Sequence, residues 1–398
     1  MTTHADGKDL PVIPAPRERR CPLAPPTQFA RWRESEGLQL AMWKDKPTWI
    51  ISRYADIRAA LVDPRLSANT MSFDLSDTSA PVIFPRIDDP EHNRLRRMMT
   101  RDFTFKRAEA MRPQIQDLVN GFLDDMIAGG SPVDLVRAFA LPVPSLVISL
   151  LLGVPYQDHE FFQRHSTTGL DSTASAEQKA ESGLALFTYM SELVARKERE
   201  PGDDLMSRLV SGYVATGQLS RETAAMDGLI LLSAGHETTA NMIALGTVAL
   251  LEHPDEFDRL RTTDDAAVAH EIVEELMRYL SIVHSQVDRV AVEDLEIGGQ
   301  FVRAGDAVLM NLPAGNWDPE FVDEPDTFNA PRGARGHLGF GFGVHQCIGQ
   351  NLARAELEIA LSTLVRRLPG LRLAVPAEQL RFMNDQEIYG LHELPIAW

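Results

Sequence analysis

The longest uninterrupted helical pattern constrains the fold most. From Arg221 to Glu252 the chain reads RETAAMDGLILLSAGHETTANMIALGTVALLE, and Ser220 stands just ahead of it as an N-cap. At a rise of 1.5 Å per residue this helix would be about 48 Å long, roughly the width of a whole domain. The rest of the chain therefore has to pack around it.

Helical periodicity also dominates elsewhere. Helices are predicted over residues 108–127, 177–196, 266–280 and 351–366. Strand-like pieces are short, namely TWIISR near residue 50, the segment 288–312, LRLAV and LHELPIAW. No repeat or low-complexity linker divides the chain. We predict a mostly α fold with small β-sheets, a single domain over residues 1–398, and an extended proline-rich arm over about residues 1–26.

Composition and charge exclude several classes. The 398 residues carry a formal net charge of −18, which disfavours nucleic acid and anionic membranes as partners. The first residues lack a signal-peptide core, and the longest apolar run holds His236, Glu237 and Asn241, which a bilayer would penalise. Cys21 and Cys347 are too few for a disulfide framework. We expect a soluble cytoplasmic protein with no membrane anchor.

Polar residues interrupt the centre of the long helix. The segment AGHETT places Gly235, Glu237 and Thr238 in an otherwise apolar stretch. Glycine costs a helix interior up to about 1 kcal/mol relative to alanine. HETTA approaches the zinc motif H-E-x-x-H, but Ala240 occupies the second histidine position. A kinked helix with self-satisfied threonines is one interpretation; the concentration of polar groups favours a functional site.

A glycine-rich loop, HLGFGFGVHQCIGQ, leads Cys347 into the last predicted helix. A dinucleotide fingerprint fails because Gln346 stands where the third glycine belongs. A Cys/His nucleophile is disfavoured because His345, two residues away, does not share a helix face with Cys347. One thiolate cannot hold zinc, but it can hold an iron whose equatorial positions a porphyrin fills. Glycines would let the backbone lie against the ring and turn N–H groups toward sulfur.

The same loop resembles the signature of the haem-thiolate monooxygenases, the cytochrome P450 superfamily. Their pattern Phe-x-x-Gly-x-His/Arg-x-Cys-x-Gly is matched by Phe340, Gly343, His345, Cys347 and Gly349. The resemblance covers nearly the whole chain and is to the soluble actinobacterial type. It implies the P450 fold, a prism-like domain with the long helix over haem b, and Cys347 as the axial ligand of the haem iron.

The resemblance implies roles for further residues. Glu275 and Arg278 match the family's Glu-x-x-Arg pair, with Arg332 as a third member of a buried structural network. Glu237 and Thr238 would be the acid and the alcohol that serve oxygen activation. The implied haem contacts are His92, Arg96, Arg289, His345, Cys347, Phe340, Gly341, Gly349 and Ala234. The implied substrate contacts are Leu231, Ala234, Ile282, Val283, Tyr389 and Leu391, together with the regions 65–88 and 160–200.

These features together predict a monooxygenase that hydroxylates a bulky, largely apolar molecule such as a polyketide, a terpenoid or a xenobiotic. It would use O2 and electrons from a ferredoxin with an NAD(P)H-supplied reductase, because the chain has no flavin fingerprint or iron–sulfur cysteine array. The ferredoxin would dock at the basic run Arg94, Arg96, Arg97 and Arg101. Two alternatives stay open: an oxidase for phenol coupling or ring formation, and a haem-thiolate sensor without catalysis.

Overall fold

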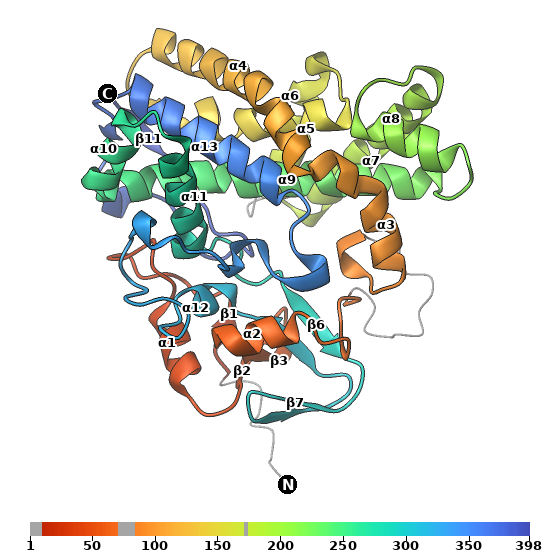
Figure 1. The fold of residues 1–398 in the computed structure, drawn as a ribbon, viewed down its shortest axis with the longest axis vertical. Coiled ribbons are helices and arrows are strands. Elements are labelled where there is room, and N and C mark those ends of the chain that lie inside the picture. Colours follow the sequence, from red (N-terminus) through yellow and green to blue (C-terminus); the bar gives the residue numbers. More distant parts are fainter. Residues whose placement is uncertain (1–9, 71–83, 171–173) are drawn as a thin grey trace.

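The computed structural model describes residues 10–70, 84–170 and 174–398. Helices fill most of it, and in Figure 1 they form the upper part of the molecule. Their bounds are α1 Thr27–Glu34, α2 Tyr54–Ala60, α3 Glu91–Thr100, α4 Phe105–Gly129, α5 Pro142–Leu152, α6 His159–Leu170, α7 Ala176–Arg199, α8 Leu205–Leu209, α9 Arg221–Glu252, α10 Pro254–Thr262, α11 Ala266–Leu280, α12 Leu312–Asn316 and α13 Gln350–Arg367.

In the part of the chain that the structure describes, the strands are short and form three small sheets. The largest has the order β1-β2-β3-β9-β6-β4 and lies in the lower part of Figure 1, with α1, α2 and α12 beside it. Pairing is parallel for β1–β2 and β3–β9 and antiparallel for the other neighbours. Its strands are β1 Val12–Ile13, β2 Gln39–Trp43, β3 Lys46–Ile51, β4 Leu66–Ser67, β6 Asp288–Ala291 and β9 Ala307–Met310. The two smaller sheets hold β5 Val133–Asp134, β10 Arg372–Leu373 and β11 Pro395–Ala397, and β7 Leu295–Ile297 with β8 Gln300–Val302.

The predicted helices are confirmed. Residues 221–252 and 266–280 match α9 and α11 end for end, and the other three predictions fall inside α4, α7 and α13. The Ser220 hydroxyl caps α9 by accepting the Thr223 N–H. The mostly α architecture with small sheets is likewise confirmed. That the chain forms one domain stays a prediction.

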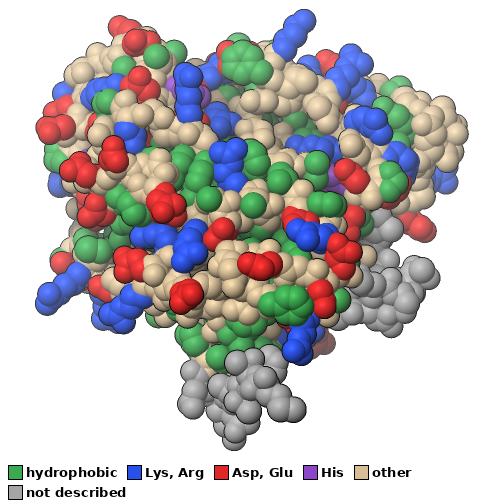
Figure 2. Space-filling model, turned by 60° about the horizontal axis from the view of Figure 1, so that its bottom comes forward, with side chains coloured by type: hydrophobic (Ala, Val, Ile, Leu, Met, Phe, Trp, Pro, Cys, Tyr) green, Lys and Arg blue, Asp and Glu red, His purple; other side chains and the backbone are tan. Residues whose placement is uncertain are grey.

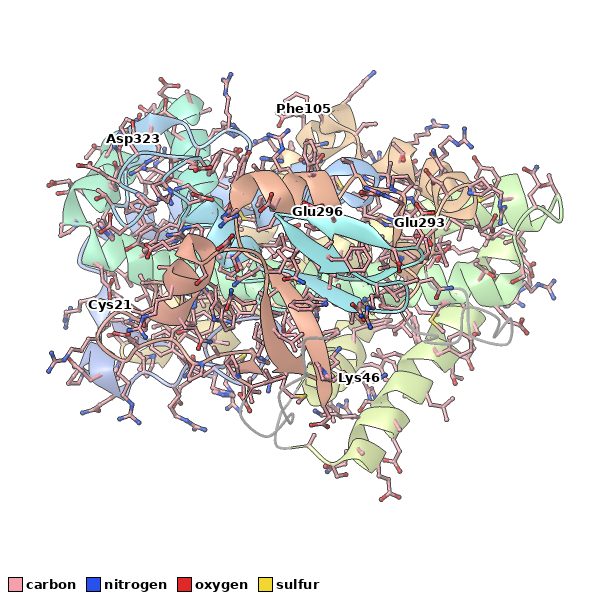
Figure 3. All side chains as sticks on the ribbon, turned by 90° about the horizontal axis from the view of Figure 1, so that it is seen from below. Cys21, Lys46, Phe105, Glu293, Glu296 and Asp323 are labelled. Carbon is pink, nitrogen blue, oxygen red and sulfur yellow. The ribbon has the colours of Figure 1, made fainter. Side chains whose placement is uncertain are left out.

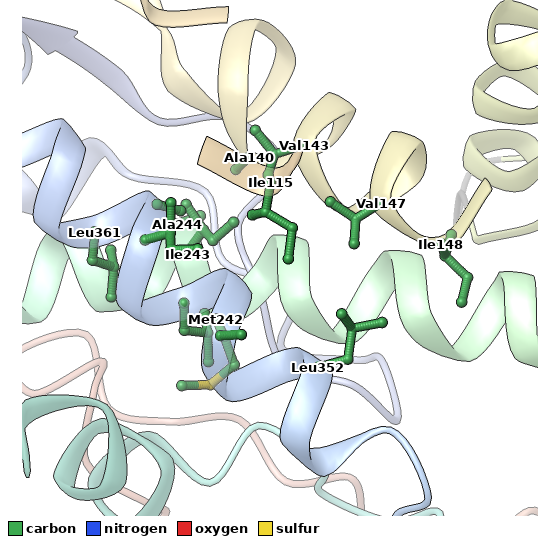
Figure 4. Packing of buried hydrophobic residues seen from close by; sticks show 14 of the residues in the cluster. Ile115, Ala140, Val143, Val147, Ile148, Met242, Ile243, Ala244, Leu352 and Leu361 are labelled. Carbon is green, nitrogen blue, oxygen red and sulfur yellow. The ribbon is translucent and has the colours of Figure 1, made fainter. Parts of the chain in front are cut away.

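The main core surrounds α9, which is apolar on nearly all sides. Figure 4 shows side chains from several neighbouring helices packed along it, such as Ile115 of α4, Ile148 of α5 and Leu352 of α13. A helix that is hydrophobic all round has to be buried. Enclosure of α9 fixes its polar centre deep inside the molecule. No helix in the described residues is both long and apolar enough to cross a membrane.

Candidate functional site

A large cavity lies between the centre of α9 and the loop that precedes α13. It holds about 1210 Å³ of space free of protein atoms, part of it open to solvent. The two helices supply much of its lining, namely Leu231, Ala234, Gly235, Thr238, Thr239 and Met242 from α9 and Leu352, Ala353, Glu356 and Leu357 from α13. The rest includes Ile282, Val283, Val287, Arg289, Phe340, Gly341, Phe342, His345, Cys347 and Gly349.

Cys347 reaches this cavity on a loop whose shape requires glycine. Gly341 and Gly343 have φ values of +69° and +76°, which residues with a side chain rarely adopt. A Cβ on Gly343 would also lie 3.0 Å from the Leu61 carbonyl oxygen. The Cys347 N–H donates to the Phe340 carbonyl oxygen at 2.9 Å and closes the loop. The thiol is thereby held at the cavity.

The Cys347 thiol is open to the cavity and otherwise surrounded by protein. Burial raises its pKa above the ordinary value, while the Gly349 N–H and the cations Arg96 and Arg354 act in the opposite direction. A metal ion deprotonates a coordinating thiol outright. Within the described ranges no group of three or more His, Cys, Asp or Glu side chains could hold a metal. The thiol therefore suits a metal whose other ligands come from a cofactor.

His345 and Arg289 line one edge of the cavity, and His92, which does not line it, packs against His345. The rings of His92 and His345 are 4.0 Å apart between centroids. Burial, and then the positive charge of Arg289, lowers the pKa of His345 to about 3, and Arg96 adds to this. Both ring nitrogens of His92 and Nδ1 of His345 are buried without a hydrogen-bond partner, and the Asp89 carboxylate comes only to 3.6 Å of His92. Each neutral imidazole has one N–H donor, and with the guanidinium groups of Arg96 and Arg289 these donors suit an anion; the two carboxylates of a haem fit.

On the opposite side of the cavity, α9 presents its polar centre. The Thr238 hydroxyl lines the cavity and donates to the Ala234 carbonyl oxygen at 2.7 Å. Gly235 lets α5 approach, because a Cβ there would lie 3.1 Å from the Ile148 side chain. The glycine therefore has a packing role as well as opening space beside Thr238.

Glu237 does not line the cavity but lies beside it on α9. Burial raises its pKa to about 7, and the nearby negative charge of Glu387 adds to the shift. Glu387 itself pairs with Lys44 at 2.6 Å on the molecular surface. A carboxyl group that titrates near neutrality, between bulk solvent and the cavity, can both accept and release protons.

The predicted structural network comes together. Glu275 accepts from Arg278 Nε at 2.9 Å and Nη2 at 2.7 Å, and Arg332 Nε lies 3.3 Å from the same carboxylate. Arg278 also donates to the carbonyl oxygens of Asn316 and Pro325. The network ties α11 to the chain between α12 and the Cys347 loop.

Sequence reasoning missed a second network next to it. Arg354 of α13 donates to Glu274 at 2.6 Å and lies over the Phe340 ring at 4.5 Å. His337 Nε2 is 3.4 Å from the same carboxylate, and its Nδ1 accepts the Gly339 N–H. Burial opposes ionisation, but the bonds from His337 and Arg354 prevail and lower the pKa of Glu274 to about 2. Each residue read singly resembles an ordinary surface residue, so no local signal identified the network.

Glu356 was missed as well. It lines the cavity from α13, is buried, and has its Oε2 atom without a hydrogen-bond partner. Burial raises its pKa well above the usual range, so this carboxyl group is neutral. The only signal in the sequence was its position nine residues after Cys347, on the face of α13 shared with Leu352 and Ala353.

The structure divides the predicted substrate contacts. Leu231, Ala234, Ile282 and Val283 line the cavity, whereas Tyr389 and Leu391 do not. Both excluded residues are buried in the core. They lie outside the lining because their segment packs behind Ile282, whose carbonyl oxygen accepts the Tyr389 N–H at 2.8 Å. A substrate contact by these two residues stays a prediction. The regions 65–88 and 160–200 fall partly outside the described residues.

A cavity with a thiol on one face, unpaired donors at one edge and the polar centre of a long apolar helix on the opposite face is what a haem-thiolate enzyme requires. The fold and the site thus define that class.

Comparisons identify the family within this class. The family model described as "Cytochrome P450" matches residues 178–396. Cytochrome P450-SU2 of Streptomyces griseolus is 46% identical, over 98% of each chain. The crystal structure of GfsF superimposes with a TM-score of 0.91 at 44% identity, covering 98% of this chain and 100% of that one. The mycinamicin VIII C21 methyl hydroxylase MycCI of Micromonospora griseorubida, bound to mycinamicin VIII, gives a TM-score of 0.89 at 37% identity, covering 98% and 100%.

The chain belongs to the cytochrome P450 family. It is a haem-binding oxidoreductase of the monooxygenase type, and its relatives are bacterial P450 enzymes. The predictions of family, cofactor and enzyme class are confirmed.

Proposed function

We propose that this P450 hydroxylates a bulky, largely apolar small molecule, with Cys347 as the axial ligand of its haem iron and a ferredoxin as electron donor. The observation that carries the proposal is the cavity between Cys347 and Thr238. Its lining is mostly apolar, and the polar groups are confined to the thiol face, one edge and the centre of α9.

Cofactor binding divides among three groups of residues. Cys347 would bind the iron, and His92, Arg96, Arg289 and His345 would hold the two carboxylates. Bound haem supplies the chemistry of dioxygen activation, which thiolate ligation favours. Other residues would pack against the two faces of the porphyrin ring. We assign Phe340, Gly341 and Gly349 to the thiol side and Ala234 to the α9 side.

Protons would enter through α9. Glu237 accepts a proton from solvent at its carboxylate, since burial and Glu387 place its pKa at about 7. Thr238 would then turn its hydroxyl from the Ala234 carbonyl toward a cavity ligand, pass its proton there, and regain one from the protonated Glu237. The two residues act in sequence, as acid and as alcohol.

Substrate selection would rest on the apolar wall formed by Leu231, Ile282 and Val283. A wall without donors or acceptors favours a ligand with extensive apolar surface. The mycinamicin hydroxylase is named for a large natural product that it binds, and a ligand of comparable bulk is the substrate class that we assign to this chain.

The electron donor would dock on the thiol side, over the start of α4. Arg97 and Arg101 are exposed there, whereas Arg94 pairs with Glu91 and Arg96 donates inward to the Gln346 carbonyl oxygen at 2.6 Å. Phe105, labelled in Figure 3, is 68% exposed and follows Arg101 by four residues. On the face that Figure 2 shows, acidic and basic side chains are interspersed. A local basic patch on a protein of net charge −18 suits an acidic ferredoxin.

Incubation with ferredoxin, reductase, NAD(P)H and labelled O2 tests the proposal. A panel of bulky natural products is first screened by the shift of the haem Soret band, and the product of each hit is weighed. We expect a gain of one labelled oxygen atom and a reaction rate that falls steeply with added salt. A product that has lost two hydrogens without gaining oxygen would indicate coupling or ring formation instead. Ligand-induced shifts without any turnover would indicate a sensor.

A further inference from the structure

The N-terminal arm places a buried guanidinium group behind the cavity wall. Arg17 is only 5% exposed, and no carboxylate pairs with it among the described residues. It donates instead to the carbonyl oxygens of Leu23 and Leu280 at 2.6 Å each, to that of Ser281 at 3.2 Å, and from Nε to His284 Nε2 at 3.1 Å. Burial lowers the pKa of Arg17 to about 10, so it stays charged at neutral pH. In Figure 3 the label of Cys21 marks this arm.

Two of its acceptors flank the residues that line the cavity. Ile282 and Val283 stand between Ser281 and His284, and both face the cavity. Ser281 has a φ of +39°, which is unfavourable for a residue with a side chain. Its hydroxyl donates to the Arg278 carbonyl oxygen at 2.7 Å. The backbone just before the wall is therefore strained and is held in place by surrounding hydrogen bonds.

Tyr389 completes the same unit. Its ring lies 4.0 Å from the Arg17 guanidinium carbon and is stacked on the His284 ring at 5.1 Å. Its N–H donates to the Ile282 carbonyl oxygen at 2.8 Å, and its hydroxyl donates to the Pro22 carbonyl oxygen at 2.9 Å. The N-terminal arm, the residues that flank Ile282 and Val283, and the C-terminal segment around Tyr389 thus all meet at the Arg17 guanidinium group.

We propose that Arg17 is a positioning residue that fixes the Ile282–Val283 wall of the cavity. It thereby determines how tightly the cavity binds a ligand that extends beyond the haem as far as this wall. The inference rests on the proposed function, because it takes the cavity to be the ligand site of the haem enzyme. The physical reason is that one charged side chain satisfies three carbonyl oxygens and a ring nitrogen. No neutral side chain can replace all four bonds, so without Arg17 the strained turn at Ser281 loses its support.

Spectral titration of the haem-loaded protein with two azoles tests this role. Imidazole and 4-phenylimidazole both bind iron through nitrogen, and only the second extends to the wall. In Arg17→Met we expect 4-phenylimidazole to bind about five- to tenfold more weakly relative to imidazole, while imidazole itself is unchanged within twofold. Arg17→Lys should show a smaller loss, because an ammonium group keeps the charge but cannot reach every acceptor.

Arg53→Met is the matched control. Arg53 also clamps backbone, through the carbonyl oxygens of Arg33 and Ser35, but it has no contact with the wall. The affinity of Arg53→Met for 4-phenylimidazole relative to imidazole should equal that of the wild type. In Arg17→Lys, hydrogen exchange should also accelerate at the amides of His284 and Tyr389, a readout that needs no haem.

The outcomes separate the two proposals. The role of Arg17 is overturned if the affinity of Arg17→Met for 4-phenylimidazole relative to imidazole stays within twofold of wild type. If Arg17→Met does not fold, the role is overturned when hydrogen exchange in Arg17→Lys is not accelerated. Either result leaves the enzyme assignment intact. Wild-type protein that takes up haem but binds neither azole overturns the assignment of the cavity and this inference with it.

Discussion

The two faces of the cavity are built on different principles. The Cys347 face is held by glycines in left-handed conformations and by two buried ion networks, around Glu275 and around Glu274. The α9 face is a plain helix whose centre carries Gly235, the hydroxyls of Thr238 and Thr239, and the perturbed acid Glu237. The Cys347 face is thus built mainly to hold its backbone and thiol in place, whereas the α9 face supplies the groups that take part in the reaction. Substitutions on the first should reduce stability, and those on the second should reduce turnover in a folded protein.

Arg278→Met should have the largest effect, because it leaves Glu275 charged and without its main partner in a fully buried site. Breaking such a pair costs about 3–5 kcal/mol. We expect haem uptake to fail or the free energy of unfolding to fall by that amount, as measured by urea titration. The control is Arg259→Met, which removes a surface ion pair and should cost about 0–1 kcal/mol.

Glu274→Gln should come next and should reveal itself through pH. The pKa of Glu274 is about 2 in the folded protein against 4.5 ordinarily, which corresponds to about 3 kcal/mol. Because the folded pKa is depressed, this stability is present above about pH 4.5 and is lost as the pH falls toward 2. The wild type should therefore lose stability over this range more steeply than Glu274→Gln. Equal slopes for the two proteins would show that the network adds nothing to the first face.

Thr238→Ala tests the second face. NAD(P)H consumption should continue while product formation falls about 100-fold, with the unfolding midpoint unchanged, since a positioned proton donor contributes roughly 10²–10⁴-fold. Thr247→Ala is the control, because Thr247 makes the same bond to the preceding turn of α9 but does not line the cavity. Equal losses in both variants would mean that the hydroxyl serves the helix and not the reaction.

Glu237 should give the smallest and most specific effect. With its pKa raised to about 7, it is protonated below that pH and ionised above it, so the yield of product per NAD(P)H should fall as the pH rises through 7. Glu387→Gln removes the like charge and lowers the pKa of Glu237, so the fall should move to lower pH. If the yield depends on pH in the same way in Glu237→Gln as in the wild type, Glu237 does not deliver protons in this reaction.

The contrast between the faces also explains what the sequence could predict. The motifs of the Cys347 face are each local in sequence, because the glycines and Cys347 share one loop and Glu275 and Arg278 are three residues apart, so their resemblance to P450 motifs could be recognised without coordinates. Helices such as α9 and α11 were predictable because periodicity and capping are local too. The packing of Tyr389 could not be predicted and Glu274 was missed because their contacts join segments 80 or more residues apart along the chain. Burial of a carboxyl group such as Glu356 is likewise a tertiary property that no short pattern records.

The most direct test of the account is the carbon monoxide spectrum of the reduced, haem-loaded protein after Cys347→Ser. The account predicts that the wild type and Cys21→Ser show the band typical of thiolate-bound haem and that Cys347→Ser loses it. If the band persists unchanged when serine replaces Cys347, the iron is held by another residue and the assignment of the cavity's two faces is wrong.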